Sequence, residues 1–486
     1  MRVFITGGTG FIGRALVPRL QRDGHSLVVW ARSPRRARDL LGADVDIVAT
    51  RAPAPALGEI LSGCDGIVNL AGESIAGKRW TRSRRRRIVQ SRVQLTESLV
   101  TALTASVARP GTLVSASAVG YYGNRADEVL TEDSTPGDDF LADLCSRWEA
   151  TALQAKDLGV RVVLLRAGVV LGRGGGALTP MLRPFRLGLG GPIGSGRQHF
   201  PWIHLHDLVT VVATALTDAS YEGPINAVAP EEATSRMLAR SLGRSLNRPA
   251  VLPIPGLALK AVFGESSIVL LGSQRVAPRR LTSHGFEWEF PTLQAALDDV
   301  VRDRAATIGR LPVSAEAVER GAAASRDRAR HDAPYELRTR TLVDAPLDET
   351  FAFFSKAENL GLLTPASMAF SIQGAVTPMQ AGSTIDYRIK LGPVHVRWRT
   401  RIEEWVPGRA FVDVQEAGPY TFWRHEHRFR ADGPRTVVED HVVYIPPFGV
   451  LGRMAHRLLI APALRRIFQY RSDIIRLRFG STAGVT

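Results

Sequence analysis

The sequence predicts an α/β domain with a doubly wound parallel sheet, followed by a linker and an α+β domain built on antiparallel strands. Three observations support this prediction. Apolar strand-like runs alternate with amphipathic helical stretches up to about residue 300. A stretch poor in large apolar residues follows, from Ile308 to Pro334. After it the hydrophobic period changes to two, which is typical of antiparallel strands with one buried face.

The first 304 residues alternate strands and helices in the order that parallel βαβ units require. The expected strands are Val3–Thr6, Leu27–Trp30, Gly66–Leu70, Thr112–Ser117 and Val160–Arg166. The expected helices are Ile12–Asp23, Arg82–Ser106 and Asp139–Leu158. A stretch rich in Gly, Pro and Arg, residues 172–201, is expected to determine substrate selectivity within a small substrate subdomain.

A glycine-rich turn joins the first expected strand to the first expected helix. Residues 4–13 read FITGGTGFIG, so the turn begins directly after an apolar run. Gly7 permits the tight turn, Gly10 allows the backbone to approach a pyrophosphate, and Gly13 allows close packing of helix on strand. The spacing predicts a dinucleotide site at the helix N-terminus, with Phe11 and Ile12 as further cofactor-binding residues.

The end of the second expected strand indicates which dinucleotide is bound. An NAD site usually places Asp or Glu there to bind the ribose 2′-hydroxyl. This sequence has Ala31 at that position, followed by Arg32 and Ser33. These two residues, with Arg35 or Arg36, can bind a 2′-phosphate instead, because a guanidinium binds phosphate through two hydrogen bonds. We therefore expect NADP(H); the alternative is that Arg32 is only a surface charge.

Further motifs accompany the glycine turn across the first 300 residues. They are Asn69–Glu73 (NLAGE), Gly77–Trp80 (GKRW), Ser115–Gly123 (SASAVGYYG), Leu165–Gly172 (LRAGVVLG) and Trp202–Leu208 (WIHLHDL). With ITGGTGFIG, this set resembles the extended, epimerase-type short-chain dehydrogenases/reductases, which have a Rossmann fold. The resemblance implies that the cofactor contacts Asn69, Leu70, Ala71 and Gly72 on its adenine–ribose side, Ser115 and Ala116 beside the nicotinamide, and Arg166.

The resemblance also implies a catalytic Ser and a Tyr-x-x-x-Lys pair, in which the tyrosine acts as general acid and base. Ser117 matches the serine, but Phe140 and Leu144 stand where the tyrosine and the lysine would be, and neither can move a proton. Tyr121 and Tyr122 at the strand end are other candidates. Lys78, one of five lysines, is a further candidate, and Cys145 is interpreted as a buried helix residue.

Three functions are compatible with these residues. The first is an NADP(H)-dependent oxidoreductase or epimerase-like enzyme that lacks the Tyr-x-x-x-Lys pair and acts on a small lipophilic or carbonyl substrate. The second is a non-catalytic NADP(H)-binding sensor or carrier. The third is an enzyme whose chemistry needs the second domain.

Residues 333–480 resemble the START-like, helix-grip (SRPBCC) domains, with residues 305–332 as the linker. The expected strands are Tyr335–Val343, Ser383–Leu391, residues 394–398 and Val437–Ile445, and the expected helices are Leu347–Leu363 and Val450–Phe479. The resemblance implies a cavity for a lipophilic ligand. Inward-facing candidates, which ordinary core packing would also explain, are Tyr387, Trp398, Phe411, Phe422 and Trp423. His425 and His427 share one strand face and are interpreted as solvated polar residues rather than metal ligands.

Composition excludes several other classes of protein. The net charge of +15 comes mostly from arginine, but no nucleic-acid-binding motif accompanies the arginine runs. The most apolar stretches are interrupted by Arg, so no membrane span is expected. Two cysteines and an N-terminus that begins as a strand favour a cytoplasmic protein without a signal peptide. No metal site is predicted, and the oligomeric state is left open.

Overall fold

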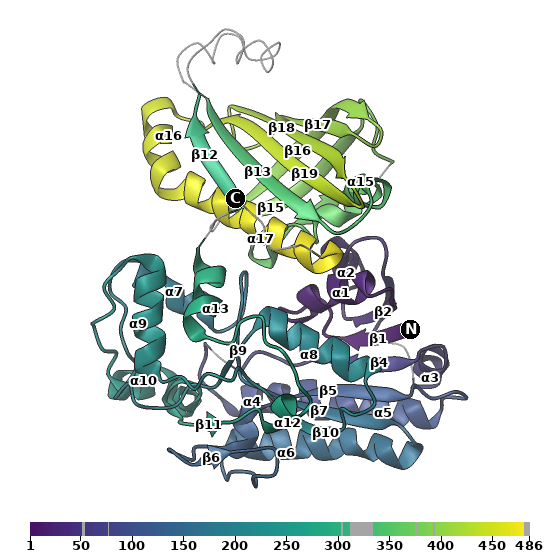
Figure 1. The fold of residues 1–486 in the computed structure, drawn as a ribbon, viewed down its shortest axis with the longest axis vertical. Helices are drawn as coiled ribbons and strands as arrows, with labels where there is room; N and C mark the ends of the chain where they lie inside the picture. Colours follow the sequence, from purple (N-terminus) through teal and green to yellow (C-terminus); the bar gives the residue numbers. More distant parts are fainter. Residues whose placement is uncertain are drawn as a thin grey trace. The chain divides into compact units, whose positions relative to one another are not determined.

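The computed structural model describes residues 1–50, 54–75, 77–302, 305–311, 334–374, 378–391 and 394–480. The chain forms two compact units, drawn in Figure 1. The first comprises Met1–Pro34 and Val45–Arg302, and the second comprises Arg35–Asp44 and Asp303–Thr486. Among the described residues, no helix combines the length and the apolar character needed to cross a membrane.

A seven-stranded parallel sheet forms the centre of the first unit, as predicted. Its strands lie in the order β3 (Asp46–Ala49), β2 (Ser26–Ala31), β1 (Arg2–Thr6), β4 (Gly66–Asn69), β5 (Thr112–Ala118), β7 (Arg161–Ala167) and β10 (Gly223–Ala227). The chain direction across the sheet reverses between β1 and β4. In open α/β sheets, ligands bind outside the carboxyl ends of the strands at such a switch point. The sequence analysis identified five of these strands and missed β3 and β10.

Helices accompany the parallel strands and bury both faces of the sheet. They are α1 (Gly13–Arg22), α3 (Ala54–Ser62), α4 (Arg82–Val89), α5 (Leu95–Thr104), α6 (Phe140–Leu153) and α8 (Leu205–Thr217), whereas nearly all of α2 (Pro34–Leu41) belongs to the second unit. Strand residues such as Phe4 and Ile67 have no exposed surface and share a core with Leu61, Leu99 and Leu103 of α3 and α5. Burial on both sides explains why these strands are almost continuously apolar.

A smaller, mainly helical part of the first unit follows the sheet. It contains α7 (Leu178–Arg186), α9 (Ser235–Leu246), α10 (Gly256–Phe263), α11 (Ile268–Leu271), α12 (Arg279–Ser283) and α13 (Leu293–Val301). Short parallel pairs join β8 (Val169–Leu171) to β9 (Trp202–His204) and β6 (Val129–Leu130) to β11 (Arg275–Val276). Phe185, Leu242 and Leu297 bring α7, α9 and α13 into one apolar cluster. The Gly-rich stretch of residues 172–201 thus contains a packed helix.

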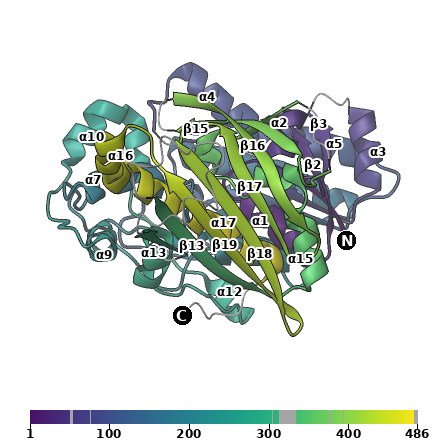
Figure 2. The ribbon, with the colours of Figure 1, turned by 90° about the horizontal axis from the view of Figure 1, so that it is seen from above.

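The second unit is an eight-stranded antiparallel sheet with a long helix packed on it (Figures 1 and 2). The strands lie in the order β12 (Ala306–Arg310), β13 (Tyr335–Val343), β19 (Arg435–Ile445), β18 (Phe422–Asp432), β17 (Ala410–Ala417), β16 (Val394–Val406), β15 (Thr384–Leu391) and β14 (Ser371–Gln373). Helix α17 (Ala461–Phe479) places Phe468 beside Trp423, and Ile474 and Ile475 beside Phe429.

Three expectations for this region need correction. Residues 306–310 of the expected linker form β12, because Ala306 and Ile308 pack into the core of the second unit; residues 312–332 lie outside the described residues. The helix expected to reach Leu363 ends earlier, as α15 (Leu347–Phe354), and a 3-10 turn follows. The single final helix is interrupted between α16 (Gly449–Ala455) and α17 by a π-helical turn, where the buried His456 stacks on Tyr335.

Candidate functional site

The glycine turn after β1 lies against the end of β4. Gly7 has φ of +70°, and a Cβ atom added to it would lie 2.7 Å from the carbonyl carbon of Leu70. A Cβ atom on Gly13 would lie 2.6 Å from the Cα atom of Gly8. Both positions therefore require glycine: Gly7 because of its positive φ and because a side chain has no space there, and Gly13 because a side chain has no space. The backbone of Gly10 is open by comparison, since only the Gly7 carbonyl oxygen lies near its added Cβ atom, at 3.0 Å.

Asn69 ties together the carboxyl ends of three neighbouring strands. Its Oδ1 atom accepts a hydrogen bond from Thr6 Oγ1 at 2.7 Å, and its Nδ2 atom donates to Thr96 Oγ1 at 2.9 Å and Ser115 Oγ at 3.3 Å. Asn69 has no exposed surface, and its buried side chain holds the strand ends at the switch point in place through these hydrogen bonds. Ala71 donates its backbone N–H to Thr6 Oγ1, and the following Gly72 is exposed.

The end of β2 lies at the same edge of the sheet. β1 and β2 pair in parallel with Thr6 opposite Trp30, so Arg32 follows the sheet edge just as the glycine turn does. Ala31 is buried, whereas Arg32 and Ser33 are exposed. The structure thus places an exposed cation at the position where the sequence predicts recognition of a 2′-phosphate. Arg35 and Arg36 belong to α2.

Ser117 is held at the end of β5 by a buried ion pair. Its Oγ atom donates a hydrogen bond to Glu149 Oε1 at 2.5 Å, and Glu149 binds Arg166 through two hydrogen bonds of 2.8 and 3.0 Å. Arg166 also donates to Tyr122 Oη at 3.0 Å, and Tyr122 donates to Asn226 Oδ1 at 2.6 Å. Arg166, which the resemblance assigns to the cofactor site, lies in this buried network with its guanidinium group directed at Glu149 and Tyr122.

Burial keeps two of the candidate proton donors in their neutral form. Burial raises the pKa of Tyr122 to about 12, against smaller opposing effects from Arg166 and Asn226. Burial likewise raises the pKa of the Cys145 thiol to about 12. Neither group exchanges protons easily near neutral pH. Tyr121 is half-buried and lies with its ring centroid 3.5 Å from the Arg166 guanidinium carbon.

Phe140, which stands where the tyrosine of the Tyr-x-x-x-Lys pair would be, borders a cavity of about 500 Å³. The cavity is lined by Trp80, Asp139, Phe140, Lys260, Gly264, Glu265, Ser267, Ile268 and Leu271. Phe140 packs on Trp80 with ring centroids 5.1 Å apart, and Leu144 is buried beneath. Ala116 belongs to the same apolar cluster, which connects this wall of the cavity to the strand that carries Ser117. Lys78 is exposed in the loop before Trp80.

Glu149 is the residue of this site that the sequence analysis missed. It lies on α6, in register with the buried residues Cys145, Trp148 and Ala152. A carboxylate on the apolar face of a helix needs a partner when buried. A charged residue at an apolar position of the helix was therefore the sequence signal that could have identified Glu149. The partner of the Glu149 carboxylate is Arg166 on β7.

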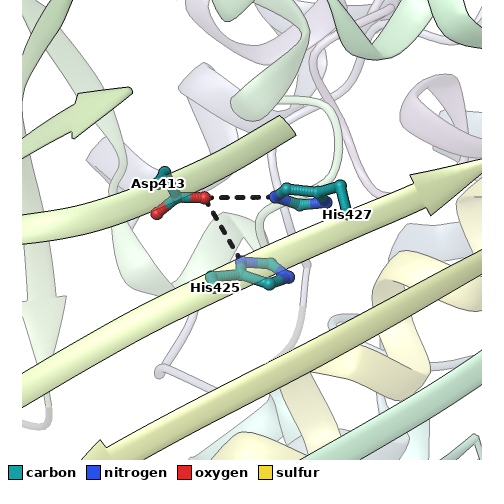
Figure 3. Close-up of side chains that lie close together, drawn as sticks. All are labelled: Asp413, His425 and His427. Carbon is teal, nitrogen blue, oxygen red and sulfur yellow. Dashed lines mark hydrogen bonds and ion pairs between the residues drawn. The ribbon is translucent and has the colours of Figure 1, made fainter. Parts of the chain in front are cut away.

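A second buried polar cluster lies in the second unit (Figure 3). His427 Nε2 lies 3.1 Å from Asp413 Oδ2, and His425 Nδ1 lies 3.6 Å from the same oxygen. The other nitrogens of both rings face Asp440 Oδ1, at 2.8 Å from His427 Nδ1 and 3.1 Å from His425 Nε2. His425 and His427 are therefore buried, and the prediction that they are solvated was wrong.

The cause of this error is the neighbourhood that the fold supplies. Asp413 and Asp440 come from β17 and β19, the strands before and after β18, and Arg471 comes from α17, further along the chain. Arg471 Nη2 lies 3.0 Å from Asp440 Oδ1, and Thr339 donates to Asp440 Oδ2 at 3.0 Å. Burial, together with the neighbouring His427, lowers the pKa of His425 to about 4, against the raising effect of Asp440 and Asp413.

The fold and the edge of its sheet define the first unit as a Rossmann-like α/β domain. Residues 3–227 match the family described as NAD dependent epimerase/dehydratase, and residues 254–300 match a domain of unknown function, DUF1731. The epimerase family protein SDR39U1 of Bos taurus is 42% identical over 306 residues, which are 62% of this chain and 100% of that protein. The chain belongs to the NAD dependent epimerase/dehydratase family.

Solved structures agree with this assignment. The crystal structure of human epimerase family protein SDR39U1 (isoform 2) with NADPH is 40% identical, covers 62% of this chain and 99% of its own, and superposes with a TM-score of 0.56. A nucleoside-diphosphate sugar epimerase from Corynebacterium glutamicum is 33% identical, covers 62% of this chain and 58% of its own, and has a TM-score of 0.51. The cofactor in the human structure agrees with the one expected from Ala31 and Arg32.

Proposed function

We propose that the first unit is an NADP(H)-dependent oxidoreductase that acts on a small lipophilic carbonyl compound. The observation that carries this proposal is the hydrogen bond from Ser117 to the buried carboxylate of Glu149, at the end of β5. α/β enzymes build their sites at this edge of the sheet. The NADPH in the crystal structure of the human relative supports the choice of cofactor.

In this proposal the dinucleotide lies across the switch point between β1 and β4. Its pyrophosphate meets the turn formed by Gly7, Gly10, Phe11, Ile12 and Gly13, where the α1 N-terminus has no side-chain cap and the helix dipole favours negative charge. Arg32 and Ser33 bind the 2′-phosphate. Leu70, Ala71 and Gly72 line the adenine–ribose side of the cofactor, and Ser115 and Ala116 lie beside the nicotinamide. Asn69 supports this site through its hydrogen bonds to Thr6 and Ser115, which hold the strand ends in place.

The proposed chemistry uses Ser117 to orient the substrate oxygen. The bound cofactor supplies a hydride. In the proposed complex the single Ser117 hydroxyl proton turns from Glu149 to the carbonyl oxygen of the substrate, and Glu149 stays paired with Arg166. Tyr121 is the proposed proton donor, since burial raises the pKa of Tyr122 and of Cys145 and so makes both groups weaker acids. The cavity beside Phe140 favours an apolar substrate with a polar group, because Trp80, Phe140, Ile268 and Leu271 line it together with Asp139, Lys260 and Glu265.

One observation favours a second function, a non-catalytic NADP(H) sensor or carrier. Phe140 and Leu144 occupy the places of the proton-transferring tyrosine and lysine, and the structure gives both of them packing roles. In this alternative the cavity binds a ligand whose affinity depends on the bound dinucleotide, without turnover.

For the second unit we propose a START-like, helix-grip domain that binds a small lipophilic ligand. Its antiparallel sheet packs against the long helix α17 and leaves a cavity of about 130 Å³. Of the aromatic residues predicted to face inward, Tyr387, Trp398, Phe411 and Trp423 line this cavity, whereas Phe422 is not among its lining residues. The volume is below the roughly 300 Å³ of a drug-sized pocket, which favours a ligand with about one ring.

The test of the first unit is NADPH oxidation by the full-length protein with a panel of aldehydes, ketones and quinones, beside a titration of NADPH affinity. We expect Ser117→Ala and Tyr121→Phe to lower kcat by about 100-fold or more, with little change in the Kd for NADPH. Ser98→Ala, an exposed serine on α5, is the matched control. Tight NADPH binding without turnover of any compound would favour the sensor or carrier instead.

A further inference from the structure

Three side chains of the second unit bring metal-binding atoms together on one face of the sheet (Figure 3). Asp413 on β17 pairs directly with His425 on β18, and His427 follows two residues later on the same face. The carboxylate oxygen of Asp413, Nδ1 of His425 and Nε2 of His427 lie within 4.8 Å of one another. Ligand atoms on a tetrahedral Zn²⁺ ion are about 3.4 Å apart, so the distances of 3.1 and 3.6 Å to Asp413 need little adjustment.

We propose that Asp413, His425 and His427 bind a divalent transition-metal ion, such as Zn²⁺ or Fe²⁺. Two imidazoles and one carboxylate on one side of an ion, with the other positions open, are the ligand set of non-haem iron sites, and similar three-residue sets hold catalytic zinc. This inference goes beyond the ligand binding proposed for the second unit, because side chains alone bind the ion.

Asp440 orients both imidazoles for this role. Its Oδ1 atom faces the ring nitrogens that do not face Asp413, at 2.8 Å from His427 and 3.1 Å from His425. An N–H group donated to Asp440 by each ring leaves the opposite nitrogen of each ring with a lone pair directed at Asp413. Metal-binding histidines are held in this way by a carboxylate behind them. Thr339 and Arg471 hold Asp440 in turn.

The charges of the cluster also favour a cation. Asp413 and Asp440 carry two negative charges and Arg471 one positive charge, while the side chains of all five residues are at most 15% exposed. With neutral imidazoles the buried cluster therefore has a net charge of −1, which is costly in a poorly solvated site. A divalent ion changes this charge to +1, and one anionic ligand on an open position then neutralises it.

The open side of the proposed site faces the ligand cavity. Asp413, His425 and His427 line the cavity of about 130 Å³ together with Tyr387, Trp398 and Trp423. An ion at this place would bind a ligand oxygen at the polar end of an otherwise aromatic pocket. The ligand class that fits is a small aromatic molecule with one carboxylate, phenolate or enolate group.

The alternative is a cluster without metal. In that case a proton on His427 Nε2 takes the place of the ion and is shared with Asp413, while Arg471 Nη2, 3.1 Å from His427 Nδ1, donates to that ring. Such a cluster is satisfied internally and has no site for a cation. The two arrangements differ in metal content, which can be measured directly.

The experiment uses the full-length protein after removal of metal with a chelator. When Zn²⁺ is added back and the excess is removed, we expect one equivalent of Zn²⁺ per chain by elemental analysis. When Co²⁺ is added in place of Zn²⁺, we expect visible absorption bands of a nitrogen-ligated ion. Zn²⁺ is expected to raise the Tm of the wild-type protein by binding only the folded state. Absence of both the stoichiometric Zn²⁺ and the Co²⁺ bands in the wild-type protein would overturn the proposal, whatever the variants show.

Variants assign the ion to its ligands. Asp413→Asn and His427→Gln keep the side-chain volume nearly constant and should abolish the Co²⁺ bands, whereas Asp440→Asn should weaken binding by about 10- to 100-fold. His441→Gln is the matched control, because His441 is next to Asp440 on β19 but pairs with Glu336. Zn²⁺ binding that survives both ligand changes in folded protein, judged by near-ultraviolet circular dichroism, would place the ion elsewhere and contradict the assignment.

Discussion

Ser117 on β5 donates a hydrogen bond of 2.5 Å to Glu149 on α6, a residue that also forms a buried ion pair with Arg166 on β7. Three elements that are separate in the sequence thus meet at the edge of the sheet where the dinucleotide is proposed to bind. A buried ion pair of this kind is costly to break, because removal of one partner leaves an uncompensated charge.

Glu149→Ala is expected to lower the free energy of unfolding by about 3–5 kcal/mol. The cause is the Arg166 guanidinium, which is only 4% exposed and would lose its carboxylate partner. Urea denaturation with a spectroscopic probe of the first unit measures the effect. The control is Asp143→Ala on the same helix, whose ion pair with Arg147 is exposed and contributes less than about 1 kcal/mol. Equal effects of the two changes would contradict the prediction.

Tyr122 should make the stability of the first unit fall at high pH. Its pKa is about 12 in the folded protein against an ordinary value of 10.0, so between these values the folded chain keeps a proton that the unfolded chain has lost. The contribution is fully present below pH 10 and is lost as the pH rises toward 12. A shift of this size corresponds to about 2–3 kcal/mol.

Tyr122→Phe removes the titrating group and tests this prediction. The variant should lose stability at neutral pH, because Asn226 Oδ1 loses its hydrogen bond, but its unfolding free energy should decline less steeply above pH 10 than that of the wild-type protein. Urea denaturation at a series of pH values measures both effects. Parallel stability curves for the two proteins would show that Tyr122 ionises normally in the fold.

Gly13→Ala is expected to weaken NADPH binding by at least about tenfold, or 1.4 kcal/mol. The added methyl group would lie 2.6 Å from Gly8 Cα, so the turn must move out of the shape proposed to bind the pyrophosphate. Quenching of intrinsic fluorescence by NADPH measures the affinity. Gly63→Ala is the matched control, because the nearest atoms to its added Cβ lie at 3.7 Å. An unchanged Kd for Gly13→Ala would place the dinucleotide away from this turn.

Arg32→Ala is expected to change cofactor preference. The loss of a charged hydrogen bond of about 1.5–3 kcal/mol should weaken NADPH binding by roughly 10- to 100-fold. NADH has no 2′-phosphate, so its affinity should stay the same. Arg147→Ala, which removes an exposed arginine from α6, serves as the control for the change in net charge. If both cofactors weakened equally, Arg32 would act on the turn or on the overall charge and not on the 2′-phosphate.

The sequence by itself predicted the parallel sheet, the glycine turn and the antiparallel character of the second unit. These features follow from local patterns: strands buried on both faces are continuously apolar, half-buried strands alternate, and a tight turn against a neighbouring strand needs glycine at Gly7 and Gly13. The edge strands β3 and β10 were missed because neither is a continuous apolar run. Asp46–Ala49 begins with a charged residue and is only partly buried, and Gly223–Ala227 contains Pro224 and Asn226.

Only the tertiary structure decided which polar residues work together. Glu149, Arg166 and Tyr122 form one buried network although their elements are distant in the sequence, and the network makes Tyr122 a poor proton donor. The same holds for His425 and His427, whose alternation in β18 suits a solvated face equally well. Whether such a face is wet or buried depends on what packs against it, and Asp413, Asp440 and Arg471 reach it only when the sheet closes on α17.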